Sequence, residues 1–170
     1  MLNQENVDTG HGSEQPTSAK KATFKIGKTA VVETSKGTFK FVLYQKDMPG
    51  TTKNFIRLAG KGFYEGTIFH RYEPGFVIQG GQARKGEETP PNIEFERCNG
   101  LVHKLGAVGM ARASEYDSAN SQFYICLGPK PEIDGEYAIF GQVTSGIDVV
   151  KKLRKGDKIL KVEIVKTAAK

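Results

Sequence analysis

Short runs of β-forming residues, separated by turns that contain glycine or proline, make up most of the chain after residue 22. Only two stretches have helical spacing instead. One covers residues 51–60, and the other begins at a capping box of Ser145 and Asp148 and ends at Gly156. Many short strands with two helices predict an antiparallel barrel or sandwich, because closure removes exposed sheet edges. The expected strands are residues 30–34, 38–44, 68–73, 77–79, 93–95, 101–102, 108–111, 121–127, 137–143 and 159–165.

The length and composition suit a single globular domain. A chain of 170 residues can bury enough apolar surface to fold without disulfides or metal ions. Residues 1–22 are polar, so we expect a disordered tail there and a folded domain over residues 23–170. The two cysteines, Cys98 and Cys126, have the spacing of neither a redox motif nor a zinc site. We expect two reduced, buried thiols, with a disulfide between them as the alternative.

The formal net charge of +6 raises the question of a nucleic-acid or membrane partner. The densest basic stretch, residues 151–161, mixes lysines with apolar residues, as on the outer face of a packed helix and strand. We therefore expect a solvated face and neither a membrane nor a nucleic-acid partner, with a polyanion site as the alternative. Since no signal-like or long apolar segment occurs, we expect a cytoplasmic protein, the alternative being a secreted one whose signal has been removed.

The most informative stretch is a β-hairpin that turns at Pro74 and Gly75. A two-residue loop would set Arg71 opposite Ile78, whereas a three-residue loop would set Arg71 opposite Gln79. We favour the three-residue loop, because it puts the two polar side chains on one solvent-facing side and leaves Ile78 for the core.

The guanidinium of Arg71 can hold a neutral peptide group without transferring a proton. Rotation about an Xaa-Pro bond needs only such help, since its barrier of about 20 kcal/mol comes from amide resonance. As the bond twists, the imide nitrogen becomes a better acceptor, so a hydrogen bond from Arg71 would strengthen in the transition state. The alternative is a surface salt bridge with Glu73, which alternation places on the same face. His70 and His103 lack triad or metal partners at a suitable spacing, so we expect packed or hydrogen-bonded histidines.

Several ordered motifs resemble the signature of the cyclophilins, the cyclosporin-binding class of peptidyl-prolyl isomerases. They begin in the hairpin with Phe-His-Arg at 69–71, Pro-Gly-Phe at 74–76 and Gln-Gly-Gly at 79–81. Further matches, in the family's order, are Gly-Met-Ala at 109–111, Ser-Gln-Phe-Tyr-Ile-Cys at 121–126, Asp-Gly at 134–135 and Phe-Gly at 140–141. The resemblance covers most of the chain after about residue 23.

The resemblance implies a mostly β fold, a closed eight-stranded antiparallel barrel capped by two α-helices, with the peptide site on its outer surface. It implies a peptidyl-prolyl cis-trans isomerase that uses no cofactor or metal and assists protein folding. Its partners would be proline-containing peptides and unfolded or folding proteins, and we expect a monomer. The alternative is a proline-peptide-binding chaperone or docking module with little turnover.

The resemblance also implies individual roles. Arg71 would be the catalytic cation, apolar and aromatic side chains would form a pocket for the proline ring, and two glutamine amides would hold peptide groups. The backbone of two further residues, Ala111 and Arg112, would face the substrate. The implied substrate-binding residues are Phe76, Val77, Gln79, Ala111, Arg112, Gln122, Tyr124, Ile133 and Tyr137.

Four residues depart from the usual family pattern. Glu132 stands where many members have Trp, Tyr137 where many have His, and Arg112 where many have Asn. Tyr124 replaces the usual Phe, which keeps an apolar wall and adds a hydroxyl at its tip. Because that Trp commonly donates a hydrogen bond to cyclosporin, Glu132 predicts weak binding of the drug with isomerisation intact.

Overall fold

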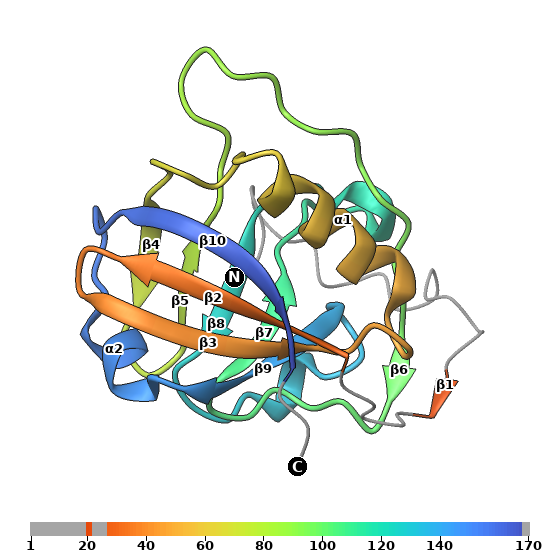
Figure 1. Cartoon of the computed structure of the whole chain (residues 1–170). Coiled ribbons are helices and arrows are strands. Elements are labelled where there is room, and N and C mark those ends of the chain that lie inside the picture. The colour runs from red at the N-terminus through yellow and green to blue at the C-terminus, as the bar shows by residue number, and fades with distance from the viewer. Residues whose placement is uncertain (1–19, 22–26, 168–170) are drawn as a thin grey trace.

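Eight strands form one antiparallel sheet in the order β10-β2-β3-β9-β7-β8-β5-β4 (Figure 1). The computed structural model describes residues 20–21 and 27–167, so the predicted tail lies almost wholly outside the described residues. Within them, the predicted mostly β fold with eight antiparallel strands and two helices is confirmed. The strands are β2 (Lys28–Thr34), β3 (Gly37–Leu43), β4 (Phe69–Glu73), β5 (Val77–Gly80), β7 (Ala107–Met110), β8 (Phe123–Cys126), β9 (Ile139–Ser145) and β10 (Ile159–Lys166).

The sheet curls so that its two end strands, β10 and β4, approach each other at their beginnings. Ile68 and Lys158, which directly precede these strands, form an antiparallel bridge. Beside this bridge, the N–H of Gly66 donates to the carbonyl of Ile159 at 2.8 Å. Closure therefore comes from the segments leading into the end strands rather than from a ladder along their whole length.

Two predicted strands, at residues 93–95 and 101–102, do not form. Ile93 makes a single bridge to Ala119, and the N–H of Phe95 donates to the carboxylate of Asp117 at 2.8 Å. A backbone donor that a side chain has taken cannot enter a ladder. A short strand forms instead just after this segment, where β6 (Cys98–Asn99) pairs in parallel with β1 (Lys20–Lys21).

The two helices are α1 (Pro49–Gly60) and α2 (Ile147–Lys152). The predicted capping box of α2 is wrong, because Gly146 with a φ of 82° occupies the N-cap and no side chain caps the helix. A Cβ at Gly146 would lie 2.7 Å from the carbonyl oxygen of Thr38, so glycine is needed for close packing on β3. The helix also ends before Gly156, because buried Leu153 adopts an extended conformation.

The core lies between the curled sheet and α1. Its centre is Phe55 of α1, whose ring lies 5.1–5.7 Å from those of Tyr64, Phe41, Phe140 and Phe123, measured between centroids. Aromatic pairs at these distances stabilise a fold beyond the area that they bury. Phe55, a member of the helical stripe predicted for residues 51–60, therefore packs at the centre of the core.

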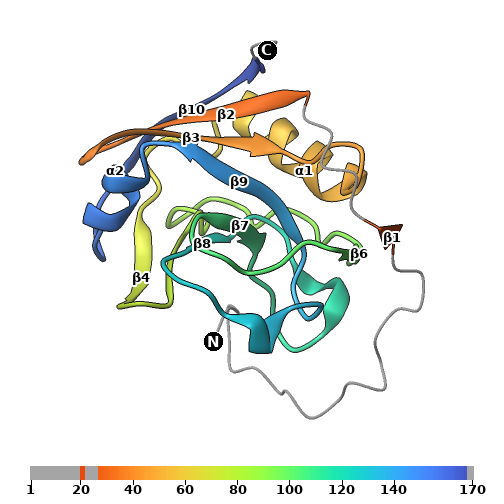
Figure 2. The same ribbon diagram turned by 90° about the horizontal axis from the view of Figure 1, so that it is seen from below.

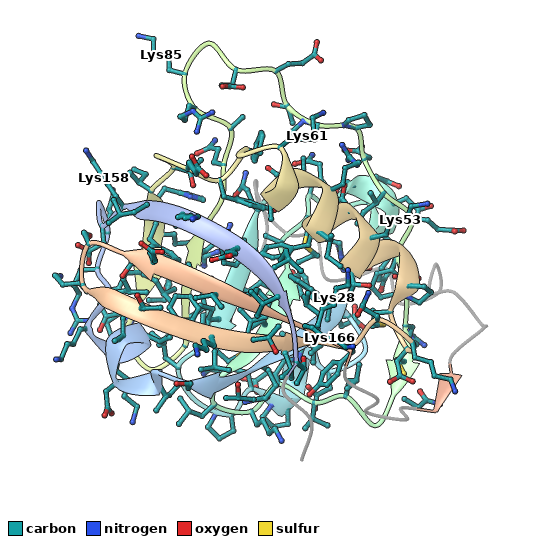
Figure 3. The ribbon with its side chains drawn as sticks, viewed as in Figure 1. Lys28, Lys53, Lys61, Lys85, Lys158 and Lys166 are labelled. Carbon is teal, nitrogen blue, oxygen red and sulfur yellow. The ribbon has the colours of Figure 1, made fainter. Side chains whose placement is uncertain are left out.

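The helices lie at opposite ends of strands β2 and β3, as Figures 1 and 2 both show. Helix α1 packs against β10, and α2 packs against β3. Lysines such as Lys53, Lys85 and Lys158 lie at separate places around the molecule (Figure 3). Within the described part of the chain, no helix has the length and apolar character needed to cross a membrane.

Gly141 and Gly60 offer a matched test of this packing. A Cβ at Gly141 in β9 would lie 2.6 Å from the carbonyl oxygen of Val42, whereas a Cβ at Gly60 would meet nothing within 4 Å. We expect Gly141→Ala to lower the free energy of unfolding by about 1–3 kcal/mol, and Gly60→Ala to raise it by up to about 1 kcal/mol. Urea unfolding of both variants measures this, and equal midpoints would contradict the described packing.

Candidate active site

Arg71 of β4 lies directly opposite Gln79 of β5. Pro74, Gly75 and Phe76 form the loop between these strands, and Gly75 has a φ of 72°. The predicted three-residue loop and its register are therefore confirmed. Nη1 of Arg71 lies 3.4 Å from Oε1 of Gln79, which directs the guanidinium across β5.

The same guanidinium forms an ion pair with Glu73. Nε and Nη2 of Arg71 donate to Oε2 of Glu73 at 3.2 and 3.0 Å. The Glu73 side chain is 48% exposed and that of Arg71 is 21% exposed, so water screens the pair. An exposed pair of this kind contributes less than about 1 kcal/mol. It orients the guanidinium and leaves part of its surface open to solvent.

Buried amides continue from Arg71 into the protein. Nε2 of Gln79 donates to Oε1 of Gln122 at 3.0 Å, and both side chains are buried. Gln79 shares a face with Arg71, as predicted, but its side chain is fully buried rather than solvent-facing. Buried amides that are hydrogen-bonded have fixed orientations.

A β-bulge brings His70 to the hydrogen-bonded amides of Gln79 and Gln122. Phe69 pairs with Gly80 and Arg71 pairs with Gln79, so His70 is an extra residue in β4. It makes a side-chain hydrogen bond with Gln122, and burial together with the charge of Arg71 lowers its pKa. Regular alternation would place His70 on the face opposite Arg71, so sequence reasoning missed this contact.

Phe76 in the hairpin loop and Ile133 in the 3-10 helix Pro131–Ile133 are half-buried apolar side chains that pack against the core. Nζ of Lys130 lies 5.1 Å from the centroid of the Phe76 ring. Val77, the other residue expected to begin the pocket, is fully buried opposite Cys126. Only Phe76 and Ile133 of these three predicted pocket residues are therefore partly exposed.

Tyr124 is fully buried, although alternation placed it with the site-facing residues. Its ring stacks on His103 at 5.8 Å and meets Tyr137 edge-on at 6.2 Å, measured between centroids. Its hydroxyl lies 2.7 Å from Nε2 of His103, and burial raises its pKa well above the usual value. The hydroxyl is thus directed into the protein.

Arg112 is buried as well, with its guanidinium between the rings of Tyr116 and Tyr137 at 4.4 and 4.5 Å. It donates to three backbone carbonyls, including that of Glu136 at 2.7 Å. Ala111 donates its N–H to the carbonyl of Gln122 at 3.0 Å. The Arg112 side chain therefore braces Tyr137 and its loop.

This arrangement is suited to holding a neutral peptide group. It has one partly exposed, oriented cation at Arg71, neutral amides behind it and apolar surface nearby. Cys126 is buried, which raises the pKa of its thiol to about 12, so it is no nucleophile near pH 7. Both cysteines are free thiols, as predicted. The described residues contain no group of three or more His, Cys, Asp or Glu side chains that could hold a metal ion.

Comparison with known proteins shows the family of the chain. The family model of the cyclophilin type peptidyl-prolyl cis-trans isomerases matches residues 29–169. The chain belongs to this family. A peptidyl-prolyl cis-trans isomerase of Synechococcus elongatus is 40% identical over 143 residues, which cover 82% of this cyclophilin and 98% of the relative. Peptidyl-prolyl cis-trans isomerase B of Bacillus subtilis is 40% identical over 128 residues, which cover 73% and 88% of the two chains.

Solved structures agree with this assignment. A Cryptosporidium parvum cyclophilin type peptidyl-prolyl cis-trans isomerase superimposes with a TM-score of 0.74 at 27% identity, covering 85% of this cyclophilin and 99% of that chain. The same protein in the presence of the dipeptide Ala-Pro gives a TM-score of 0.73 at 29% identity, with coverage of 83% and 99%. The family, its isomerase activity and its fold are thus shown for this chain.

Acidification should destabilise this cyclophilin, because burial lowers the pKa of both His70 and His103 below 6.5. Just below pH 6.5 the unfolded chain binds more protons than the native protein, so the free energy of unfolding falls as the pH falls through the native pKa values. Urea midpoints measured at about pH 7.5 and about pH 5.5 check this.

The matched control carries both His70→Asn and His103→Asn. Its midpoint should depend less on pH in this window, since carboxylates titrate at lower pH. An equal pH dependence of wild type and control would contradict the assignment to these two histidines.

Proposed function

We propose that this chain catalyses rotation about Xaa-Pro bonds with Arg71 as the catalytic cation. The observation that carries the proposal is the oriented guanidinium, opposite Gln79 in the strand register and at the same hairpin as the half-buried ring of Phe76. A donor that is already oriented stabilises the twisted imide nitrogen without further reorganisation. The reaction requires no proton transfer and no covalent intermediate.

The proline ring packs on Phe76 and Ile133 in this proposal, because both are partly exposed apolar side chains. Val77 and Tyr124 are fully buried and support that surface from behind. Apolar contacts hold the ring while the carbonyl side of the bond rotates, so the ring need not move in the transition state.

The polar residues keep the substrate backbone in place. Gln122 holds a peptide group and, with Gln79, orients Arg71. Ala111 has already used its N–H on Gln122, so it presents its carbonyl to the peptide. Tyr137 lines the site in this proposal. The guanidinium of Arg112 packs on the Tyr137 ring and holds it in place, without contacting the substrate itself.

Proline-containing peptides, and unfolded or folding proteins that contain them, are the proposed substrates. The presence of Ala-Pro with the Cryptosporidium parvum neighbour supports a short Xaa-Pro segment as the minimal ligand. Because Arg71 recognises a neutral peptide group, residues flanking the proline would affect binding less than the proline itself.

Arg71→Ala and Glu73→Gln together test the catalytic assignment. We expect Arg71→Ala to reduce kcat/KM for a short Xaa-Pro peptide about 100-fold or more, with peptide affinity changed less. Glu73→Gln removes the exposed ion pair but keeps the cation, so its rate should stay within about threefold of wild type. The cis-to-trans rate, followed with catalytic amounts of each protein, gives both values.

The competing function is a proline-binding module with little turnover. For that module, a well-folded wild type would bind the peptide without accelerating its isomerisation, and Arg71→Ala would keep its affinity. Equal losses of rate in Arg71→Ala and Glu73→Gln would instead mean that the ion pair, rather than the cation, matters.

Weak cyclosporin binding is proposed from Glu132, which is exposed in the short 3-10 helix Pro131–Ile133. A carboxylate cannot donate the hydrogen bond that an indole N–H supplies. Glu132→Trp should tighten cyclosporin binding about tenfold or more and leave the isomerisation rate within about threefold. Inhibition titrations of both proteins measure this, and equal inhibition constants would refute the role of this position.

We also propose that the protein acts as a cytoplasmic monomer without a nucleic-acid partner. The support for the compartment is two buried free thiols, which suit reducing conditions. The support against a polyanion site is the spread of lysines over separate surfaces (Figure 3). DNA or RNA binding whose affinity falls steeply with added salt would contradict the proposed absence of a nucleic-acid partner.

A further inference from the structure

A buried histidine connects two parts of the proposed proline site. Nδ1 of His103 lies 2.8 Å from Oδ1 of Asp134, and Nε2 of His103 lies 2.7 Å from the hydroxyl of Tyr124. The His103 side chain is 0% exposed, and that of Asp134 is 27% exposed. Neither the sequence motifs nor the proposed catalytic step assigns His103 a role.

The chemistry of the partners determines which nitrogen carries the proton. The Asp134 carboxylate can only accept, so Nδ1 of His103 donates to it. Burial lowers the pKa of His103, so its ring is neutral near pH 7 and Nε2 has a lone pair. The hydroxyl of Tyr124 therefore donates to Nε2, which fixes the tyrosine ring at its tip.

The backbone of His103 holds the loop that carries Ile133. Its N–H donates to Oδ1 of Asp134 at 2.7 Å, and its carbonyl accepts from the N–H of Lys130 at 2.8 Å. These two residues bracket the 3-10 helix Pro131–Ile133. One residue thus holds both ends of the loop on one side and Tyr124 on the other.

Gly109 completes the arrangement. It lies directly opposite Tyr124 in the β7–β8 ladder, and a Cβ at Gly109 would clash with the Tyr124 hydroxyl. The space for the hydroxyl therefore exists because residue 109 is glycine. The stacking of His103 on the Tyr124 ring, with 18° between their planes, leaves that ring little freedom to tilt.

We propose that His103 is a positioning residue for the proline site, which sets the spacing between Tyr124 and the Ile133 loop and so sets affinity for the proline ring. His103 does not touch the substrate. This inference rests on the proposed function, because it takes Tyr124 and Ile133 as the support and wall of the proline site. A histidine that served stability alone would leave the kinetics of the folded protein unchanged.

The first test compares His103→Leu with Thr52→Val. Oγ1 of Thr52 donates to the carbonyl of Met48 at 2.8 Å in α1, so this control loses another buried hydrogen bond, one in the helix. We expect His103→Leu to weaken binding of an Ala-Pro peptide about tenfold, in the dissociation constant and in KM, with kcat changed less than about threefold. Thr52→Val should lower the melting temperature and leave both binding values unchanged.

His103→Asn and Tyr124→Phe separate the effects of the two side-chain hydrogen bonds of His103, one with Asp134 and one with Tyr124. Asparagine keeps a donor for Asp134, but its side chain is too short to accept from Tyr124 as well, so its loss of affinity should be intermediate. Tyr124→Phe should add little to the loss in His103→Leu, because that variant has already lost the same hydrogen bond. If His103→Leu does not fold, His103→Asn takes its place in the comparison.

Imidazole ¹⁵N NMR of the wild type supplies a test without any variant. We expect the tautomer protonated on Nδ1 for His103. An Nε2-protonated neutral ring, or unchanged peptide affinity in folded His103→Leu, overturns the proposal. Since the dissociation constant is measured without turnover, a failure of the isomerase function would appear separately, as a wild type that binds the peptide but does not accelerate its isomerisation.

Discussion

One cross-strand row in the sheet determines where the proposed active site of this cyclophilin lies. Arg71 of β4 pairs with Gln79 of β5, Gln79 pairs with Tyr124 of β8, and Tyr124 pairs with Gly109 of β7. Directly opposed residues share a face, so a cation, an amide, a phenol and a glycine that leaves room for the phenol hydroxyl follow one another across four strands. A slip of one residue in any of these pairings would turn part of the row to the other face.

Burial separates Arg71 from the other side chains of this row. Arg71 is in the end strand β4 and keeps part of its side chain in water, whereas Gln79 and Tyr124 in inner strands are fully buried. A charge at the end strand avoids the cost of full desolvation. Neutral groups, which cost less to bury once hydrogen-bonded, occupy the interior.

Local sequence patterns predicted which residues of this row pair with each other better than they predicted which of them are buried. The turn residues Pro74 and Gly75 placed the hairpin but left two loop lengths open, and the pairing of two polar side chains then selected the register in which Arg71 faces Gln79. The motifs after residue 23 likewise indicated the family, and so the eight antiparallel strands. The burial of Gln79 and Tyr124 could not be predicted, because the residues that cover or contact them, such as His103, come from segments distant in sequence. The bulge at His70 depends on strand pairing, and glycine at the start of α2 depends on close packing against β3, so neither follows from local propensity.

The supporting groups behind Arg71 are neutral, and this matters for the catalytic role proposed for Arg71. A buried carboxylate next to Arg71 would compete strongly for its donors, because Coulomb attraction grows as the effective dielectric falls. The amides of Gln79 and Gln122 instead orient the guanidinium through dipoles alone. The one carboxylate paired with Arg71 in the described structure is that of Glu73, which is 48% exposed and screened by water. In the role proposed for Arg71, a twisting imide nitrogen would compete for the guanidinium only with neutral groups and a screened anion, which would leave the cation available to the transition state.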